Sequence, residues 1–150
     1  MQRSFTYQKI LKGLGIAIVF GLYQSLSSIY LLLPPLFGVL FFYFIHALKK
    51  ENLPALVLII GLLLIFEAEK DFLLFSSLVY FTFVYRFVIP RLRMMISCKV
   101  CLKVLLMVLA YLGFILYSII LNQVLWVEVP SFDWHIFYYM FIEFFLVLSL

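Results

Sequence analysis

Charged residues are scarce in this chain. Only 12% of its 150 residues are Asp, Glu, Lys or Arg, against roughly 25% in a soluble domain. Cysteine occurs only at Cys98 and Cys101, and this CxxC pair has no nearby ligands to complete a metal site. The sequence has no glycine-rich phosphate loop, and neither His46 nor His135 neighbours a serine or cysteine that it could activate. We therefore expect no catalytic residue, no cofactor and no enzyme activity.

Hydrophobic residues, in contrast, make up 67% of the chain, and its mean hydropathy is +1.21. A soluble fold of this size leaves much of its surface in water and could not cover so much apolar side chain. A bilayer suits this composition, and inside it the backbone must pair within helices or a closed barrel. Barrel strands alternate polar and apolar residues, whereas the apolar runs here are continuous. The sequence predicts an all-α integral membrane protein.

Short polar stretches divide the chain into six predicted transmembrane helices within a single domain, 1–150. Pro34-Pro35 ends the first helix, because proline lacks an N–H and constrains the residue before it. The second and third helices are shorter than the roughly 20 residues that span a bilayer, and a re-entrant hairpin is the alternative to two short spans. The predicted helices cover 13–33, 36–48, 53–66, 72–89, 100–124 and 135–150.

The net charge of +4 is interpreted as a topology signal, and nucleic-acid binding is not expected. With the N-terminus in the cytoplasm, ten of the eleven Lys and Arg residues fall at or near the inner face, and only Lys70 falls outside. This asymmetry satisfies the positive-inside rule. It predicts cytoplasmic N- and C-termini and a multi-pass protein of the bacterial inner membrane. The most basic cytoplasmic loop is predicted over 91–99, with Arg91, Arg93 and Lys99, and Lys103 follows in the first turn of the next helix.

Small residues recur every four positions along the first predicted helix, at Gly13, Ala17, Gly21 and Ser25. Such a stripe lets a second helix approach closely in a bilayer, where packing replaces the missing hydrophobic drive. Two interpretations remain open: packing within the chain, and docking onto a partner subunit.

One carboxylate, Glu143, lies well inside a predicted span. An unpaired charge at that depth costs about 2.5 to 3.5 kcal/mol on insertion scales, so it should face other helices. By depth its expected partner is Arg86, with Lys103 second. We expect an interhelical pair that fixes packing; a proton- or ion-coupling site and contact with a partner protein are the alternatives.

Two further groups are assigned to surfaces. Glu67, Glu69 and Asp71 are expected in a solvated outer loop, with a clamp for a hard cation as the alternative. Phe and Tyr supply most of the 20% aromatic content, and we expect them mainly to face lipid and the membrane interface.

The stretch from Pro34 to Arg93 resembles the rod-shape-determining MreD family. The resemblance lies in Pro34-Pro35-Leu36 before a short helix, a basic turn, and Gly61-Leu62-Leu63-Leu64 near the end of the next helix. An acidic group and another apolar helix with a basic end follow. The resemblance implies a non-enzymatic membrane scaffold for cell-wall elongation. Such a scaffold binds MreC and helps to couple the peptidoglycan elongation synthases to filaments inside the cell.

Two other functions remain open. Substrate-binding S-components of energy-coupling-factor transporters for vitamins or metals are also small six-helix proteins, and the MreD fold is similar to theirs. They dock through a small-residue stripe on the first helix, which Gly13, Ala17 and Gly21 could imitate. The third interpretation is an accessory subunit that stabilises another membrane complex.

Overall fold

The computed structural model describes residues 2–126 and 133–149, with the backbone alone for residues 2–6. Helix accounts for 84% of the structure, and no strand occurs in those two ranges, which confirms the all-α class. Two helical stretches, Tyr7–Ile29 and Lys99–Leu125, are long and apolar enough to cross a membrane. The Arg3 side chain, one of the cations counted at the inner face, and Leu150, the predicted end of the sixth helix, lie outside the described residues.

The helices form six continuous segments in the described part of the chain, which matches the number predicted. The fourth segment joins α4, the π-helical turn η1 and α5, and the fifth joins α6, the π-helical turn η2 and α7. The elements are α1 (Gln2–Ile29), α2 (Phe37–Lys49), α3 (Leu53–Glu69), α4 (Ser76–Phe83), η1 (Val84–Val88), α5 (Ile89–Met95), α6 (Lys99–Val108), η2 (Leu109–Gly113), α7 (Phe114–Leu125) and α8 (His135–Ser149).

Several predicted boundaries are wrong. The first helix begins at Gln2 rather than residue 13, because Gln, Lys and Arg near its start are good helix formers. It ends at Ile29, four residues before the predicted end at Leu33. The fourth segment starts at Ser76 instead of residue 72 and continues to Met95. Two residues of the predicted basic loop, Arg91 and Arg93, are therefore helical and exposed.

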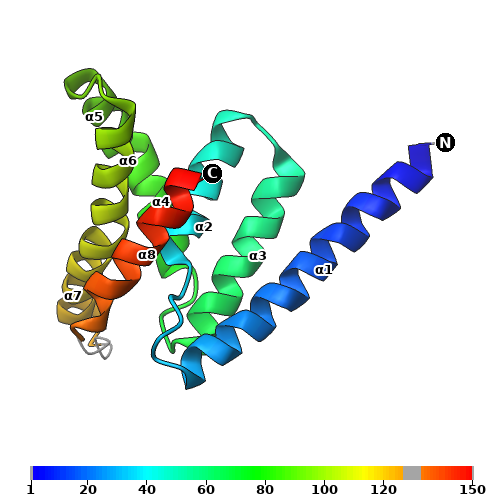
Figure 1. Cartoon of the computed structure of the whole chain (residues 1–150), viewed down its shortest axis with the longest axis horizontal. Helices are drawn as coiled ribbons and strands as arrows, with labels where there is room; N and C mark the ends of the chain where they lie inside the picture. The colour runs from blue at the N-terminus through cyan, green and yellow to red at the C-terminus, as the bar shows by residue number, and fades with distance from the viewer. Residues whose placement is uncertain (1, 127–132, 150) are drawn as a thin grey trace.

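Neighbouring helices in the sequence run in alternating directions (Figure 1). Both chain ends, the α2–α3 turn and α5 lie toward the upper edge in that view, and the α1–α2 and α3–α4 connections lie at the lower edge. Helix α3 packs between α1 and α2, and α2 also packs on α8 and η2. Helix α1 slants away from the rest of the body toward its N-terminus (Figure 1).

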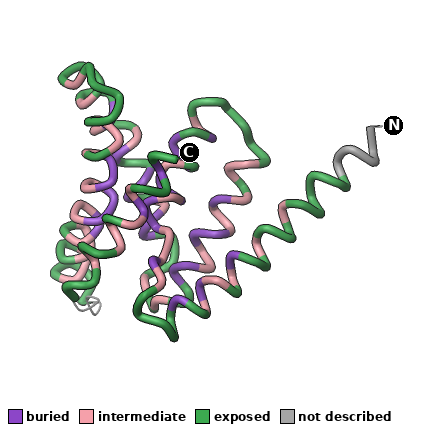
Figure 2. Tube along the Cα trace, viewed as in Figure 1, coloured by how far each residue is buried: buried purple, intermediate pink, exposed green. Residues whose placement is uncertain are grey.

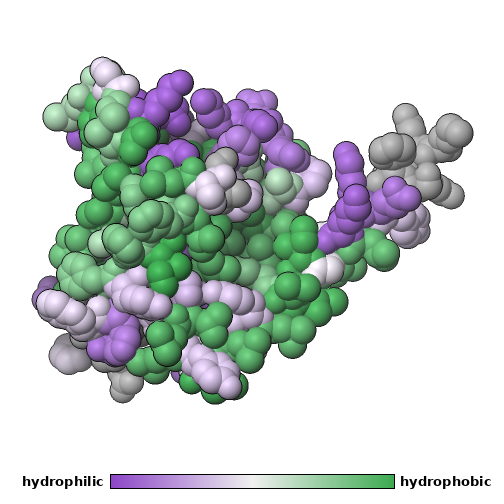
Figure 3. Space-filling model, viewed as in Figure 1, coloured by the Kyte–Doolittle hydropathy of each residue, from purple (hydrophilic) through white to green (hydrophobic). Residues whose placement is uncertain are grey.

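Buried residues follow the inner sides of α2, α3 and η2, while α1 is exposed along most of its length (Figure 2). The visible surface is apolar across its middle, and hydrophilic residues gather at the upper edge and along the N-terminal part of α1 (Figure 3). The centre of the core is aromatic. Phe37 is the hub, with its ring centroid 4.8 Å from Phe114, 5.0 Å from Phe81 and 5.1 Å from Phe66. The expectation that aromatic residues mainly face lipid is wrong for this cluster.

Each π-helical turn has a local cause or use. Pro90 lies in the first turn of α5. Proline has no backbone N–H and disturbs the regular hydrogen bonding of a helix that continues through it, and the π-helical turn η1 lies directly before this position. In η2 the Leu109 carbonyl accepts a hydrogen bond from the Tyr80 hydroxyl at 2.6 Å. That bond joins α4 to the α6–α7 segment.

Gly113 lets Tyr80 reach this carbonyl, so we expect Gly113→Ala to lower the free energy of unfolding by about 1–3 kcal/mol. A Cβ at position 113 would overlap the Tyr80 hydroxyl and lie 3.1 Å from its Cζ, and Tyr80 is itself buried. Reversible unfolding in mixed micelles, followed by circular dichroism, measures the change. The control is Gly61→Ala in α3, where an added Cβ meets nothing within 4 Å. Equal behaviour of the two variants would contradict the close approach.

Candidate functional site

Glu143 of α8 is fully buried, with 0% of its surface exposed, and it caps the start of α2. Its Oε2 accepts hydrogen bonds from the backbone N–H of Gly38 at 2.7 Å and of Val39 at 3.2 Å. Its Oε1 accepts a short hydrogen bond from the Tyr111 hydroxyl. The first N–H groups of a helix have no partner within the helix and carry partial positive charge. Both carboxylate oxygens are therefore occupied by structural bonds.

Glu67 of α3 caps the start of α4, and only 1% of its surface is exposed. Its Oε2 accepts from the Phe75 N–H at 2.6 Å, and its Oε1 accepts from the Ser77 N–H at 2.6 Å. The Ser76 hydroxyl adds a longer bond of 3.3 Å to Oε1. The prediction of a solvated loop position is therefore wrong for Glu67, because α3 runs to Glu69 and turns this side chain inward.

The two capped helix ends share one construction. A bulky residue in the left-handed region precedes each helix, Leu36 with φ 56° and Phe75 with φ 68°. Such residues rarely adopt this conformation, which costs of order 1–3 kcal/mol. In both places a glutamate from another helix accepts hydrogen bonds from the backbone there: Glu143 from Gly38, two residues after Leu36, and Glu67 from the strained Phe75 itself and from Ser77. The two glutamate caps offset this strain and fix the first turns of α2 and α4.

Helix α1 holds the connection that leads to α2. Tyr23 donates to the Pro34 carbonyl at 2.8 Å, and Gln24 Nε2 donates to the Pro35 carbonyl at 2.7 Å. Ser27 donates to the Leu33 carbonyl at 2.9 Å. These bonds satisfy three consecutive backbone acceptors in a segment that is not helical. The polar residues on α1 therefore serve the fold of this connection.

A cavity of about 290 Å³ lies between the end of α1, the end of α3, the α6–α7 segment and the start of α8. It belongs to the same edge of the body as the α1–α2 connection. Its inner walls are apolar and largely aromatic, and its polar side chains lie on segment ends and on α7. The residues that line the cavity include Ser28, Phe37, Phe66, Lys70, Phe72, Phe114, Ile115, Asp133 and His135.

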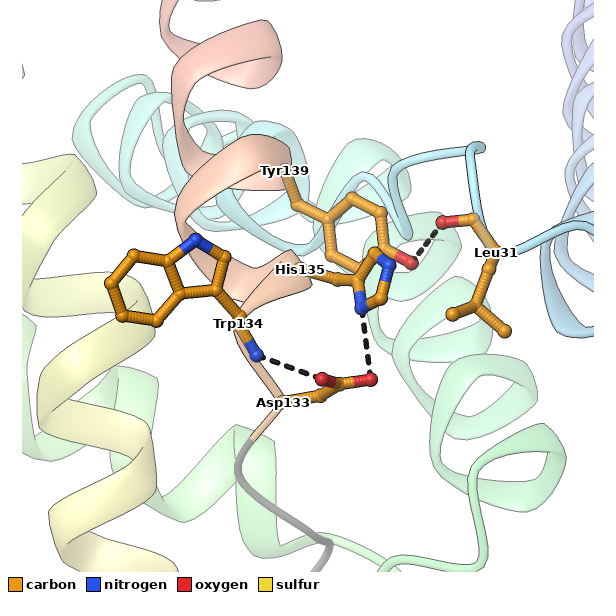
Figure 4. Close-up of polar contacts among 5 residues, drawn as sticks. All are labelled: Leu31, Asp133, Trp134, His135 and Tyr139. Atoms are coloured by element: carbon orange, nitrogen blue, oxygen red, sulfur yellow. Dashed lines mark hydrogen bonds and ion pairs between the residues drawn. The ribbon is translucent and has the colours of Figure 1, made fainter.

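Two separate sets of polar contacts lie at the start of α8, one around Asp133 and one between Tyr139 and the α1–α2 connection (Figure 4). Asp133 Oδ1 accepts from the Trp134 N–H at 2.9 Å, and Asp133 Oδ2 lies 2.9 Å from His135 Nδ1. Tyr139, one turn further along α8, donates a short hydrogen bond to the Leu31 carbonyl. Both oxygens of the Asp133 carboxylate are thus engaged.

Lys70 follows α3 and is half-buried in the cavity wall. Burial lowers the pKa of its ammonium group, and the neighbouring Glu69 opposes that shift. The Glu69 carboxylate itself accepts a hydrogen bond from Ser25 at 3.0 Å. The Lys70 ammonium group has no hydrogen-bond or ion-pair partner among the described residues.

Comparison with protein-family models, curated proteins and solved structures finds no match for this chain. Among the described residues no three His, Cys, Asp or Glu side chains lie close enough to hold a metal ion together. Cys98 and Cys101 are both exposed, and the Cys101 N–H bonds Cys98 Sγ at 3.4 Å.

The small-residue stripe of α1 packs on α3 of the same chain. A Cβ at Gly13 would lie 3.0 Å from Leu58 Cδ1, and one at Gly21 would lie 4.0 Å from Ile65 Cγ2. Ala17 packs against the core, and Ser25 bonds Glu69. Of the two interpretations, packing within the chain is the one that the structure contains.

The predicted pair between Glu143 and Arg86 is not formed. Arg86 is exposed within η1, and Glu143 is bonded to α2 and Tyr111 instead. Backbone donors at a helix start can satisfy a buried carboxylate as a cation would. Lys103, the second expected partner, donates to the Val147 carbonyl at 3.3 Å. Lys99 is exposed at the start of α6.

Three features of this region were missed from the sequence. Tyr111 was not singled out, and the capping role of Glu67 and the cavity were not foreseen. A signal existed for Glu67: it is an acid in the last turn of an apolar helix, nine and ten residues before the serine pair Ser76-Ser77 that starts the next one. No local signal marks Tyr111, because its bond to Glu143 joins residues 32 positions apart.

Proposed function

We propose that this chain is a multi-pass protein of the bacterial inner membrane that acts as a non-enzymatic scaffold of the cell-wall elongation machinery, with an MreC-like partner. The charge asymmetry of the sequence supports the membrane topology, with the hydrophilic upper edge of Figure 3 as the cytoplasmic side. The resemblance of residues 34–93 to the MreD family supports the choice of machinery.

The observation that carries the scaffold proposal is the uncovered surface of α1. One side of this helix packs on α3. Its other sides present a row of exposed apolar residues, among them Leu14 at 57% and Ile18 at 63% exposed. Within a bilayer such a surface meets either lipid or the transmembrane helix of a partner, which gains packing contacts there. The partner surface proposed is therefore the face of α1 that carries Leu14 and Ile18.

The scaffold proposal predicts that the double variant Leu14→Ala, Ile18→Ala recovers about ten-fold less MreC-like partner. The partner is copurified in mild detergent from the cell that encodes both proteins and quantified by mass spectrometry. The stability of the double variant is expected to equal that of the wild type, because neither Leu14 nor Ile18 packs against the core.

The matched control is Leu116→Ala, Ile120→Ala on α7. These residues have the same types, the same four-residue spacing, and exposed fractions of 63% and 61%. Equal recovery from both double variants would count against the α1 face. Absence of MreC and the elongation synthases from the wild-type preparation would count against the scaffold.

A second candidate function is the binding of a small solute, as in an S-component of an energy-coupling-factor transporter. The cavity of about 290 Å³ at the edge of the body that carries the α1–α2 connection is the observation that favours it. Copurification of a pair of ATPases with a transmembrane coupling subunit would support this candidate over the scaffold. An accessory role in another complex has no specific observation in its favour.

A further inference from the structure

We propose that the cavity beside the start of α8 binds an amphipathic anion, with an apolar body of one or two rings and one anionic group held by Lys70. The inference rests on the same cavity as the second candidate function and names the ligand class for it. It does not depend on an MreC-like partner.

The volume sets the size of the apolar body. A dry cavity of about 150 Å³ holds one benzene ring, and this one measures about 290 Å³. It is near the lower end of the range of small-molecule pockets. A naphthalene-sized group fits that space, whereas a large cofactor does not.

The walls set the chemistry of the body. Phe37, Phe66 and Phe114 line the inner part, and Phe72 and Ile115 line the sides. Phe37 and Phe66 are fixed in place by mutual ring contacts at 5.1 Å, and Phe72 lies 5.3 Å from Phe114 at an edge-to-face angle of 82°. Rigid aromatic walls favour flat apolar groups, since edge and face contacts add to the area buried.

The charge at the cavity sets the polar end of the ligand. Asp133 also lines it, but both of its oxygens are bonded within the α8 cluster of Figure 4. The half-buried Lys70 ammonium group has no hydrogen-bond or ion-pair partner within the described ranges. An anion beside it would form a charge-assisted hydrogen bond and offset the cost of burying the ammonium group. The exposed Ser28 hydroxyl is a second donor on the wall.

Binding of 2-naphthoate to the full chain in nanodiscs of zwitterionic lipid tests this inference. Equilibrium dialysis, with empty nanodiscs subtracted, gives the dissociation constant. We expect 2-naphthoate to bind about ten-fold more tightly than neutral 2-naphthamide. Lys70→Met should remove that difference and leave naphthamide binding unchanged, and Lys70→Arg should restore it. Ile115→Trp should abolish binding of both probes by filling the cavity, with circular dichroism and gel filtration as checks on folding.

The same anionic chemistry occurs in lipid headgroups and in free solutes, and native mass spectrometry of the purified chain separates the two sources. A retained anionic phospholipid that Lys70→Met releases supports the ligand class with a lipid source. Specific naphthoate binding without retained lipid supports a free solute.

Equal affinity for both probes, or a Lys70→Met variant that keeps the preference, overturns the ligand class and leaves solute binding standing. No binding of either probe and no retained lipid overturns the site altogether.

Discussion

Replacing Glu143 with alanine is expected to lower the free energy of unfolding by about 3 kcal/mol. The change leaves the N–H groups of Gly38 and Val39 and the Tyr111 hydroxyl without their acceptor in a buried site, and each unmade bond costs about 1 kcal/mol or more. Stability is measured by reversible unfolding in mixed micelles with circular dichroism. We expect Glu143→Gln to lose only about 1 kcal/mol, because the amide oxygen still accepts from α2 and the amide N–H can donate to Tyr111.

The control for Glu143 is Glu51→Ala, because Glu51 is an exposed acid in the turn after α2. Its removal should leave stability nearly unchanged. A stable Glu143→Ala variant would show that α2 does not need this cap. An alanine and a glutamine variant with equal losses would show that the charge, rather than an acceptor, matters at this position.

Glu67→Ala is expected to have a similar effect, again about 3 kcal/mol, but at α4. Two backbone bonds of 2.6 Å and one hydroxyl bond are lost together, each worth about 1 kcal/mol. The strained Phe75, with φ 68°, would then have less to hold it. Hydrogen exchange measured by mass spectrometry should show faster exchange in peptides that cover Phe75 and Ser77, in addition to the global loss.

The matched control is Glu69→Ala, two residues further along the same helix. Glu69 is exposed, and its carboxylate accepts one hydrogen bond among the described residues, from the Ser25 hydroxyl at 3.0 Å. The loss on Glu69→Ala should therefore stay below about 1 kcal/mol. Similar losses for the two glutamates would contradict the assignment of Glu67 as the cap of α4.

The number of helical segments could be predicted from the sequence, because continuous apolar runs and punctuation such as Pro34-Pro35 depend only on local composition. Contact between the α1 stripe and some helix could be predicted as well, since small residues at four-residue spacing form a flat face. Which helix it meets could not be predicted: α3 is chosen by how the whole bundle closes.

The partners of the buried acids could not be predicted for a different reason. From the sequence, the expected partner of Glu143 is a cation at matching depth, whereas the structure supplies backbone N–H groups from α2 and the Tyr111 hydroxyl. Backbone donors have no sequence signature. The same holds for η2, where the Leu109 carbonyl accepts a hydrogen bond from the Tyr80 hydroxyl of another segment. The cavity arises where several segment ends meet, so no single stretch of sequence encodes it.

The hydrogen bond between Gly38 and Glu143 joins residues that are 105 positions apart in the sequence. During translation, at about 5–20 residues per second, α2 emerges several seconds before the residue that caps it. Until α8 is synthesised, the first N–H groups of α2 need another acceptor, such as water or a chaperone. In a truncated chain without α8, these N–H groups would lack the Glu143 acceptor permanently. We expect the uncapped start of α2 to make such an incomplete chain a substrate for membrane proteases.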